Sequence, residues 1–255
     1  MKNFRRQHRP KKNSLIIGRD AVKSAIESGK PLDRIYLQNN IHGKLIEDIK
    51  LLAAEHSVPI NKVPIEKLNG FNIGSHDGVV AVISRVHYYE LQEVISHVVE
   101  KGETPLFLLL DGITDIRNIG GIARTAYCCG VHALIIPDKG VGALHEDAIL
   151  TSAGALEEIL VCRVNSLMKA VDELHLNGIK VFASEMKSSK NVFDCNFREP
   201  CAIIMGNEEK GIYPALIKIS DEKFKIPMTG EFESLNVGVA TGMIVYEVMK
   251  QRMKK

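Results

Sequence analysis

The chain of 255 residues lacks the short motifs that mark several common enzyme classes. Its five cysteines include no CxxC pair, so a zinc site or a thioredoxin-like site has no support. Neither HExxH nor GxSxG occurs, which argues against zinc peptidases and α/β-hydrolases. The longest apolar runs, such as Leu106–Leu110 and Val131–Pro137, are far too short to span a bilayer. We therefore expect no metal site, no membrane segment, and the reduced, mostly buried thiols of a cytoplasmic protein.

Glycine motifs for nucleotide binding are also missing. Gly140 and Gly142 begin a GxGxxG pattern, but His145 stands where the third glycine is required. Residues 205–212, MGNEEKGI, superficially resemble a phosphate-binding loop, but Ile212 follows Gly211 where a lysine and then a hydroxyl residue are needed. The sequence therefore gives no support for a Rossmann-type site or for an NTPase.

What the chain does contain is ordinary for a soluble globular protein, with 45% hydrophobic and 25% charged residues. The net charge of +2 is unevenly distributed, and the remainder of the chain carries −4 once the basic residues of the first thirteen are set aside. Those six residues are Lys2, Arg5, Arg6, Arg9, Lys11 and Lys12. Residues 1–13 are expected to be a disordered tail, either an arm that binds a phosphate backbone or a solvated extension. No apolar stretch follows them, so we do not expect a secretory signal.

Hydrophobic periodicity predicts two α/β domains. Residues 14–87 alternate between short helices and strands, residues 88–104 are expected to hold a connecting helix, and residues 105–255 form a second α/β series. The helices expected are Lys44–Glu55, one around Val22 and Ile26, and a final helix from Ser234 to Arg252. The strands expected are Arg34–Gln38, Val58–Val63, Val79–Ser84, Leu106–Leu110, Ala133–Ile136, Lys180–Ala183, Cys201–Met205 and Lys223–Ile226.

Three polar segments of the second domain each follow an apolar strand, where open α/β sheets bind their ligands. In residues 111–126, DGITDIRNIGGIARTA, we expect Asn118 in a loop and Arg124 about one turn into a helix. That pattern suits a phosphate or ribose site, although a surface ion pair explains Arg124 alone. Residues 205–212 are expected to form a turn that is bounded by Gly206 and Gly211. In residues 226–240, IPMTGEFESLNVGVA, Ser234 is expected to cap the final helix and Asn236 to lie in its first turn.

Taken together, the three segments resemble the three motifs of the SpoU family of knotted, SPOUT-class RNA ribose methyltransferases. The matching parts are NxxxxxR at residues 118–124, GxExxG at 206–211 and IPM…SLNV at 226–237. Residues 14–87 resemble, more loosely, the ribosomal-protein-like RNA-binding domain of TrmH/RlmB-type members. That match rests on Ile17-Gly18 before a helix and on the run from His76 to Ala81.

The resemblance implies a trefoil-knotted, parallel α/β methyltransferase domain, S-adenosyl-L-methionine as cofactor, an RNA substrate and a homodimer. It implies that the catalytic residues are Arg124, Asn118, Glu208, Ser234 and Asn236. The residues that it implies for the cofactor site are Met205, Gly206, Asn207, Gly211, Ile226, Met228 and Leu235. Two positions depart from the family pattern, since Ile116 replaces the usual proline and Gly238 a frequent serine.

The activity implied is methyl transfer to a ribose 2′-hydroxyl, with guanosine of large-subunit ribosomal RNA as the preferred target. Because arginine is almost never deprotonated in proteins, Arg124 is expected to orient the acceptor and stabilise charge rather than act as a base. Two alternatives stay open: a tRNA 2′-O-methyltransferase, and an RNA-binding protein that has lost catalysis.

Overall fold

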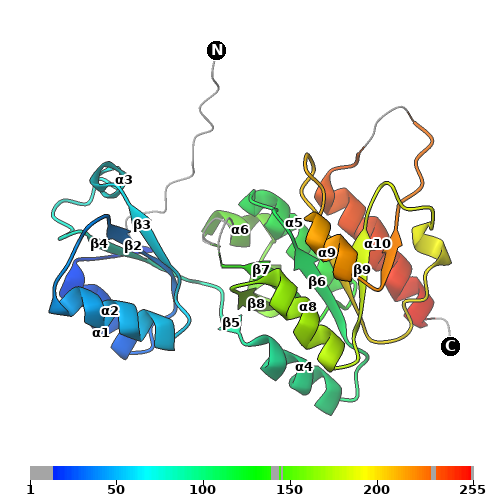
Figure 1. Cartoon of the computed structure of the whole chain (residues 1–255), viewed down its shortest axis with the longest axis horizontal. Helices are drawn as coiled ribbons and strands as arrows, with labels where there is room; N and C mark the ends of the chain where they lie inside the picture. Colours follow the sequence, from blue (N-terminus) through cyan, green and yellow to red (C-terminus); the bar gives the residue numbers. More distant parts are fainter. Residues whose placement is uncertain (1–13, 139–143, 145, 231–233, 254–255) are drawn as a thin grey trace. The chain divides into compact units, whose positions relative to one another are not determined.

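The structure is a computed structural model that describes residues 14–138, 144, 146–230 and 234–253. The basic tail expected at residues 1–13 lies outside the described residues. The chain divides into two compact units, the first running to Val86 and the second beginning at His87 (Figure 1).

The first unit is a four-stranded sheet with the strand order β1-β4-β2-β3. Strand β4 runs antiparallel to β1 and β2, whereas β2 and β3 are parallel. Apolar residues of α1 and α2 pack on the sheet, which confirms the helical faces expected from the sequence. The elements are β1 (Leu15–Ile17), α1 (Arg19–Glu27), β2 (Leu32–Gln38), α2 (Lys44–Glu55), β3 (Ile60–Val63), α3 (Ile65–Asn69) and β4 (Val79–Ile83).

The second unit is a seven-stranded sheet with the order β11-β9-β10-β6-β7-β8-β5, and every neighbouring pair is parallel. Its elements are β5 (Tyr88–Tyr89), α4 (Leu91–Glu100), β6 (Leu106–Leu110), α5 (Ile116–Cys128), β7 (Ala133–Pro137), α6 (Glu146–Thr151), α7 (Ala155–Glu158), β8 (Leu160–Val164), α8 (Leu167–Leu176), β9 (Lys180–Ser184), the 3-10 helix η2 (Val192–Asp194), β10 (Cys201–Met205), α9 (Pro214–Ile219), β11 (Glu222–Phe224) and α10 (Val237–Met253).

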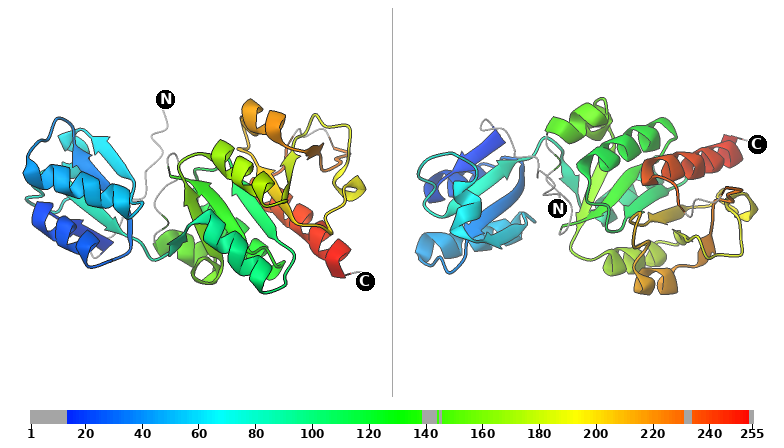
Figure 2. Two further views of the ribbon diagram at one scale, coloured as in Figure 1. Left: turned by 60° about the horizontal axis from the view of Figure 1, so that its bottom comes forward. Right: turned by 90° about the horizontal axis from the view of Figure 1, so that it is seen from above.

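The central strands are continuous apolar runs because helices cover both faces of the sheet. All five residues of β6, LFLLL, and all five of β10, CAIIM, are buried. Helices α4, α8 and α9 pack on one face. Helices α5 and α10 pack together on the other, as the view from above in Figure 2 shows. The segment 88–104 belongs to this core, since β5 pairs with β8 and α4 packs against the sheet.

Strand order places the late part of the chain in the middle of the sheet. Strand β10 lies between β6 and β9, and its register pairs Met205 with Leu110. Because the strands are parallel, their carboxyl ends share one edge of the sheet. The segments that follow Leu110 and Met205 therefore begin side by side, and a backbone hydrogen bond of 2.8 Å from Asp111 N to Met205 O joins them.

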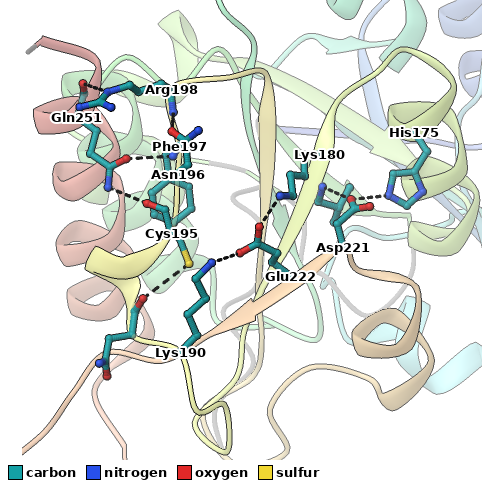
Figure 3. A network of polar contacts seen from close by, with 12 residues as sticks. His175, Lys180, Lys190, Cys195, Asn196, Phe197, Arg198, Asp221, Glu222 and Gln251 are labelled. Atoms are coloured by element: carbon teal, nitrogen blue, oxygen red, sulfur yellow. Dashed lines mark hydrogen bonds and ion pairs between the residues drawn. The ribbon is translucent and has the colours of Figure 1, made fainter. Parts of the chain in front are cut away.

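Polar contacts hold the C-terminal part of the chain near the amino ends of the strands, opposite the edge just described. Arg252 of α10 donates to four backbone carbonyl groups, those of Thr104, Pro105, Phe197 and Glu199, at 2.6–3.0 Å. Gln251 donates to the carbonyl of Cys195 and accepts from the amide of Phe197 (Figure 3). The Glu222 carboxylate of β11 bridges Lys180 and Lys190, and both lysines lower its pKa. These contacts hold β11 and the segment around η2 to β9 and α10.

Candidate active site

The loop after β6 ends at a helix cap. The Asp115 carboxylate accepts a hydrogen bond of 2.9 Å from the amide of Arg117, so α5 begins at Ile116. The expectation that Asn118 lies in a loop is therefore wrong, because Asn118 is in the first turn of α5. Arg124 lies two turns into the helix instead of one, because the Asp115 cap starts the helix at Ile116.

The loop after β10 is closed by its own backbone. Asn207 and Gly211 exchange two backbone hydrogen bonds of 2.8 and 3.1 Å, and Gly211 has a φ of +68°. A Cβ at Gly206 would lie 2.4 Å from the Gly211 carbonyl carbon, so only glycine fits there. The Asn207 side chain accepts from the amides of Glu209 and Lys210 and donates to the Gly112 carbonyl at 3.0 Å. This turn holds Glu208 at its exposed tip.

The final helix begins later than expected. It starts at Val237, and the Asn236 side chain accepts hydrogen bonds from the amides of Gly238 and Val239 at 3.0 and 3.3 Å. Asn236 is therefore the N-cap, and the expectations that Ser234 caps this helix and that Asn236 lies inside it are wrong. Asparagine is as good a cap as serine, and here the geometry of the backbone selects it.

The three loops meet at Glu208. Its Oε1 atom accepts hydrogen bonds from Nδ2 of Asn118 at 3.1 Å and from Nδ2 of Asn236 at 3.0 Å. The amide of Val237 lies 3.4 Å from the same oxygen, and Asn236 also donates to Oδ1 of Asn118 at 3.3 Å. Asn118 and Asn236, which lie 90 and 28 positions from Glu208 in the sequence, thus bind the same carboxylate oxygen. The other oxygen, Oε2, has no hydrogen bond to another described residue.

Arg124 and Ser234 stand apart from this cluster. Both side chains are exposed, and neither has a hydrogen bond or ion pair with any residue that the structure describes. A surface ion pair, which would explain Arg124 without a function, is thus not present within the described part of the chain. As far as the described residues go, the guanidinium of Arg124 has no partner that would compete with an anionic or polar ligand.

The expected cofactor residues line the strand ends. Met205 and Ile226 are buried, while Met228 and Leu235 are half-buried. No hydrogen bond joins the backbone of Ile226 or Met228 to another described residue. Apolar side chains beside unpaired backbone donors and acceptors suit an uncharged heterocycle on a flexible chain, as in S-adenosylmethionine. The residues present therefore fit this cofactor.

The sequence pattern did not single out Asp111 and Tyr213, which the structure brings together. The Asp111 carboxylate accepts a hydrogen bond of 2.6 Å from the amide of Tyr213 and so links the loop after β6 to the start of α9. An aspartate directly after a buried strand is the only signal that marks this role in the sequence.

His76, which the resemblance placed in a motif of the first unit, is buried there. Its Nδ1 accepts from the amide of Gly78 at 3.1 Å, which leaves Nε2 to donate to the Asn69 side chain at 2.9 Å. The imidazole therefore shapes a loop. No group of His, Cys, Asp and Glu in the described ranges could hold a metal ion. Within those ranges, no helix is both long and apolar enough to cross a membrane.

Two family models match the chain. The SpoU rRNA Methylase family model matches residues 105–246, and a model described as RNA 2′-O ribose methyltransferase substrate binding matches residues 15–89. The chain is 33% identical over 238 residues to YacO of Bacillus subtilis (strain 168), whose name assigns it to the TrmH family of tRNA/rRNA methyltransferases. The match covers 93% of this chain and 95% of YacO.

Two solved structures are similar. The SpoU methyltransferase AviRb from Streptomyces viridochromogenes, in complex with AdoMet, has a TM-score of 0.60 and 25% identity, over 94% of this chain and 91% of that one. The TrmH/SpoU tRNA modifying enzyme of A. aeolicus has a TM-score of 0.55 and 29% identity, over 64% of this chain and 84% of that one. The chain therefore belongs to the SpoU family of RNA methyltransferases, whose cofactor is S-adenosyl-L-methionine.

Proposed function

We propose that this protein methylates a ribose 2′-hydroxyl in RNA. The observation that carries the proposal is that Asn118 and Asn236 both donate hydrogen bonds to one carboxylate oxygen of Glu208, so that the three motif segments meet at one point. The family model matched by the first unit, which is described by 2′-O ribose methylation, supports the same acceptor.

S-adenosylmethionine, when bound, supplies the methyl group on a sulfonium. The chain's own residues must hold the acceptor oxygen in line with that group, and such positioning is worth about 7–11 kcal/mol. They must also accept or steer the proton of the hydroxyl, which is a poor nucleophile at neutral pH. Met205, Gly206, Asn207, Gly211, Ile226, Met228 and Leu235 are the residues that we propose hold the cofactor.

Glu208 is placed to hold the ribose. Its Oε1 atom is fixed by Asn118 and Asn236, and no other residue that the structure describes donates a hydrogen bond to Oε2. We propose that Oε2 accepts a hydrogen bond from the ribose. Ser234 is exposed two residues before Asn236, and we propose that its hydroxyl is a further hydrogen-bonding group for the ribose.

Arg124 supplies positive charge. Because its guanidinium stays protonated, Arg124 cannot take up the hydroxyl proton; it orients the acceptor and stabilises the negative charge that develops on the oxygen, while an RNA phosphate takes up the proton. An Arg124→Ala variant is expected to bind the cofactor normally and to lose turnover. Near-normal turnover in this variant would remove Arg124 from the mechanism.

The preferred substrate is guanosine in large-subunit ribosomal RNA, with residues 14–87 as the RNA-binding domain and residues 105–255, together with the segment 88–104 that packs in the same core, as the catalytic domain. A tRNA substrate is the second candidate, supported by the relatives that are named for both RNAs. Mapping 2′-O-methyl sites in ribosomal RNA and tRNA from a deletion strain distinguishes the two. Calorimetry with S-adenosylmethionine tests the third candidate, a non-catalytic RNA-binding protein, which would show no binding.

We also propose that the protein is a homodimer in the cytoplasm. Val239, Met243 and Tyr246 are exposed at helical spacing on one face of α10. Exposed Tyr127 lies on α5, the helix that packs against α10. Contiguous exposed apolar side chains of this kind mark association surfaces.

We also infer that the C-terminal part of the chain is knotted, as in the family. The strand order supports this, because the chain returns from β9 to place β10 between two strands that it has already made.

A further inference from the structure

An exposed aromatic side chain stands beside the candidate active site. Tyr213 follows the glycine-bounded turn and immediately precedes Pro214, the first residue of α9. Its side chain is 61% exposed and has no hydrogen bond or ring contact with any residue that the structure describes. A large ring left in water at this place has no structural role that the fold explains.

The backbone that carries this ring is held firmly. The Tyr213 amide donates to Oδ2 of Asp111 at 2.6 Å, and its carbonyl accepts from the amides of Leu216 and Ile217 at 2.9 and 3.2 Å. The preceding side chain, Ile212, is buried in the core. Only the two side-chain torsions of Tyr213 remain free, so little entropy is lost when the ring binds a partner.

The same contacts tie Tyr213 to the catalytic loops. Asp111 directly follows β6, and the carbonyl of its neighbour Gly112 accepts the hydrogen bond from Asn207. Asn207 precedes Glu208. Other described exposed aromatic side chains lie elsewhere, on β5, α5, η2 and α10: Tyr89, Tyr127, Phe193 and Tyr246.

We propose that the Tyr213 ring is a stacking surface for a nucleobase of the substrate RNA, next to the ribose that is methylated. The inference rests on the proposed function. A ribose can reach residues at a strand end only if its nucleotide is splayed from the RNA, and unstacked bases are then received by aromatic side chains. Such stacking tolerates any base, so Tyr213 sets the position of the nucleotide rather than its identity. Tyr213 is a positioning residue.

The test compares four variants at one position. Tyr213→Phe and Tyr213→Trp keep an aromatic ring, whereas Tyr213→Leu and Tyr213→Ala do not. Methyl transfer from labelled S-adenosylmethionine to ribosomal RNA and tRNA from a deletion strain gives kcat and KM. We expect the Leu and Ala variants to lose about 5- to 100-fold in kcat/KM, mostly through KM for RNA, and the Phe and Trp variants to stay within about threefold. Calorimetry should give the same cofactor affinity for all.

Three results would overturn the inference: an unchanged Ala variant, a Leu variant as good as Phe, or a loss that follows cofactor affinity. Failure of the proposed function looks different, because the wild-type protein would then place no methyl group on a 2′-hydroxyl. In that case the affinity of the five proteins for a labelled single-stranded oligoribonucleotide still decides whether the ring stacks on RNA.

Discussion

Glu208 shows how much a single side chain can organise. One oxygen of its carboxylate accepts hydrogen bonds from the starts of α5 and α10, and the other has no hydrogen bond among residues 14–138, 144, 146–230 and 234–253. A carboxylate makes stronger hydrogen bonds than a neutral amide, so its charge matters to both neighbours. The fold brings the three loops together, and Glu208 fixes how their side chains face one another.

Replacing Glu208 by glutamine should therefore cost activity rather than stability. We expect Glu208→Gln to lower kcat about 100-fold, because the amide carries no charge and can accept at only one of its two terminal atoms. The cofactor affinity and the melting temperature should change little, since the residue is exposed. Single-turnover methyl transfer measures the effect.

The matched control is Glu209→Gln. Glu209 is the next residue and is also exposed, and its side chain makes no hydrogen bond or ion pair with another described residue. An equal loss in both variants would show that the loop only needs negative charge, and would contradict the role given to Glu208.

At the scale of residues, the sequence predicted which residues belong to the site better than it predicted the local structure around each of them. The resemblance named Asn118, Glu208 and Asn236, and the structure joins them. It could not show that Asn236 caps α10 or that Asn118 is helical, because both depend on where Asp115 and Asn236 find free amides. Tyr213 was missed because its partner, Asp111, lies 102 positions away.

At the scale of single elements, two adjacent glycines of α5 have different roles. A Cβ at Gly120 would lie 2.7 Å from the Ala148 carbonyl oxygen and 2.9 Å from Cβ of Thr151, both in α6. A Cβ at Gly121 would meet nothing within 4 Å. Gly120 therefore allows α5 and α6 to approach closely, whereas Gly121 only weakens the helix.

We expect Gly120→Ala to destabilise the protein by about 1–3 kcal/mol through overpacking. Gly121→Ala should stabilise it by about 0.5–1 kcal/mol, because alanine is the better helix former. Chemical denaturation of both variants checks the pair. Effects of the same sign would mean that α5 and α6 are not in this close contact.

Arg252 anchors the last turn of α10. Its guanidinium donates to the carbonyls of Thr104, Pro105, Phe197 and Glu199, and the bonds to Pro105 and Phe197 are partly buried. Without Arg252 the Pro105 carbonyl keeps only the Cys201 amide as donor, and the other three carbonyls lose the donor that Arg252 supplies. Arg252→Ala should cost about 2–4 kcal/mol, and lysine should restore only part of this because it lacks the planar fork. Arg198→Ala is the control, since Arg198 is exposed and makes a single 3.4 Å contact with α10. Equal thermal stability of the two alanine variants would refute the anchor.

Helices and strands that bury one or both faces could be predicted, because burial leaves a hydrophobic pattern in the sequence. The bounds of α2 match the expected helix Lys44–Glu55, and the apolar runs of β6 and β10 are strands. The strand expected at Lys223–Ile226 ends at Phe224, and that at Val58–Val63 begins at Ile60. Strand order could not be predicted, because β10 pairs with β6 across about 95 residues and no local pattern encodes that choice.

At the scale of the whole molecule, the apolar face of α10 predicts the oligomeric state. Tyr246→Glu places a charge in the proposed interface and should convert a dimer to a monomer at micromolar concentration, as sedimentation velocity would show. Leu176→Glu is the control, because Leu176 is 87% exposed on α8, away from α10. A wild-type monomer, or a dimeric Tyr246→Glu variant, would rule out this interface.

The basic tail gives a second prediction at this scale. Deleting residues 2–13 removes the six positive charges. If the tail binds phosphates, RNA affinity should fall and the slope of log affinity against log salt should flatten by up to about 4. Affinity measured between low and physiological salt decides the question, and an unchanged slope would favour a solvated extension.

The position of β10 has a consequence for how the protein is made. A ribosome delivers β6 and β9 before β10, the strand that must lie between them. Until about residue 205 has left the exit tunnel, the apolar run LFLLL has one unpaired edge, and such edges invite aggregation. The first unit can fold during synthesis, whereas the sheet of the second must wait for nearly the whole chain. Cells that make this protein therefore need the unfinished sheet to be shielded during translation, and prematurely terminated chains should be insoluble.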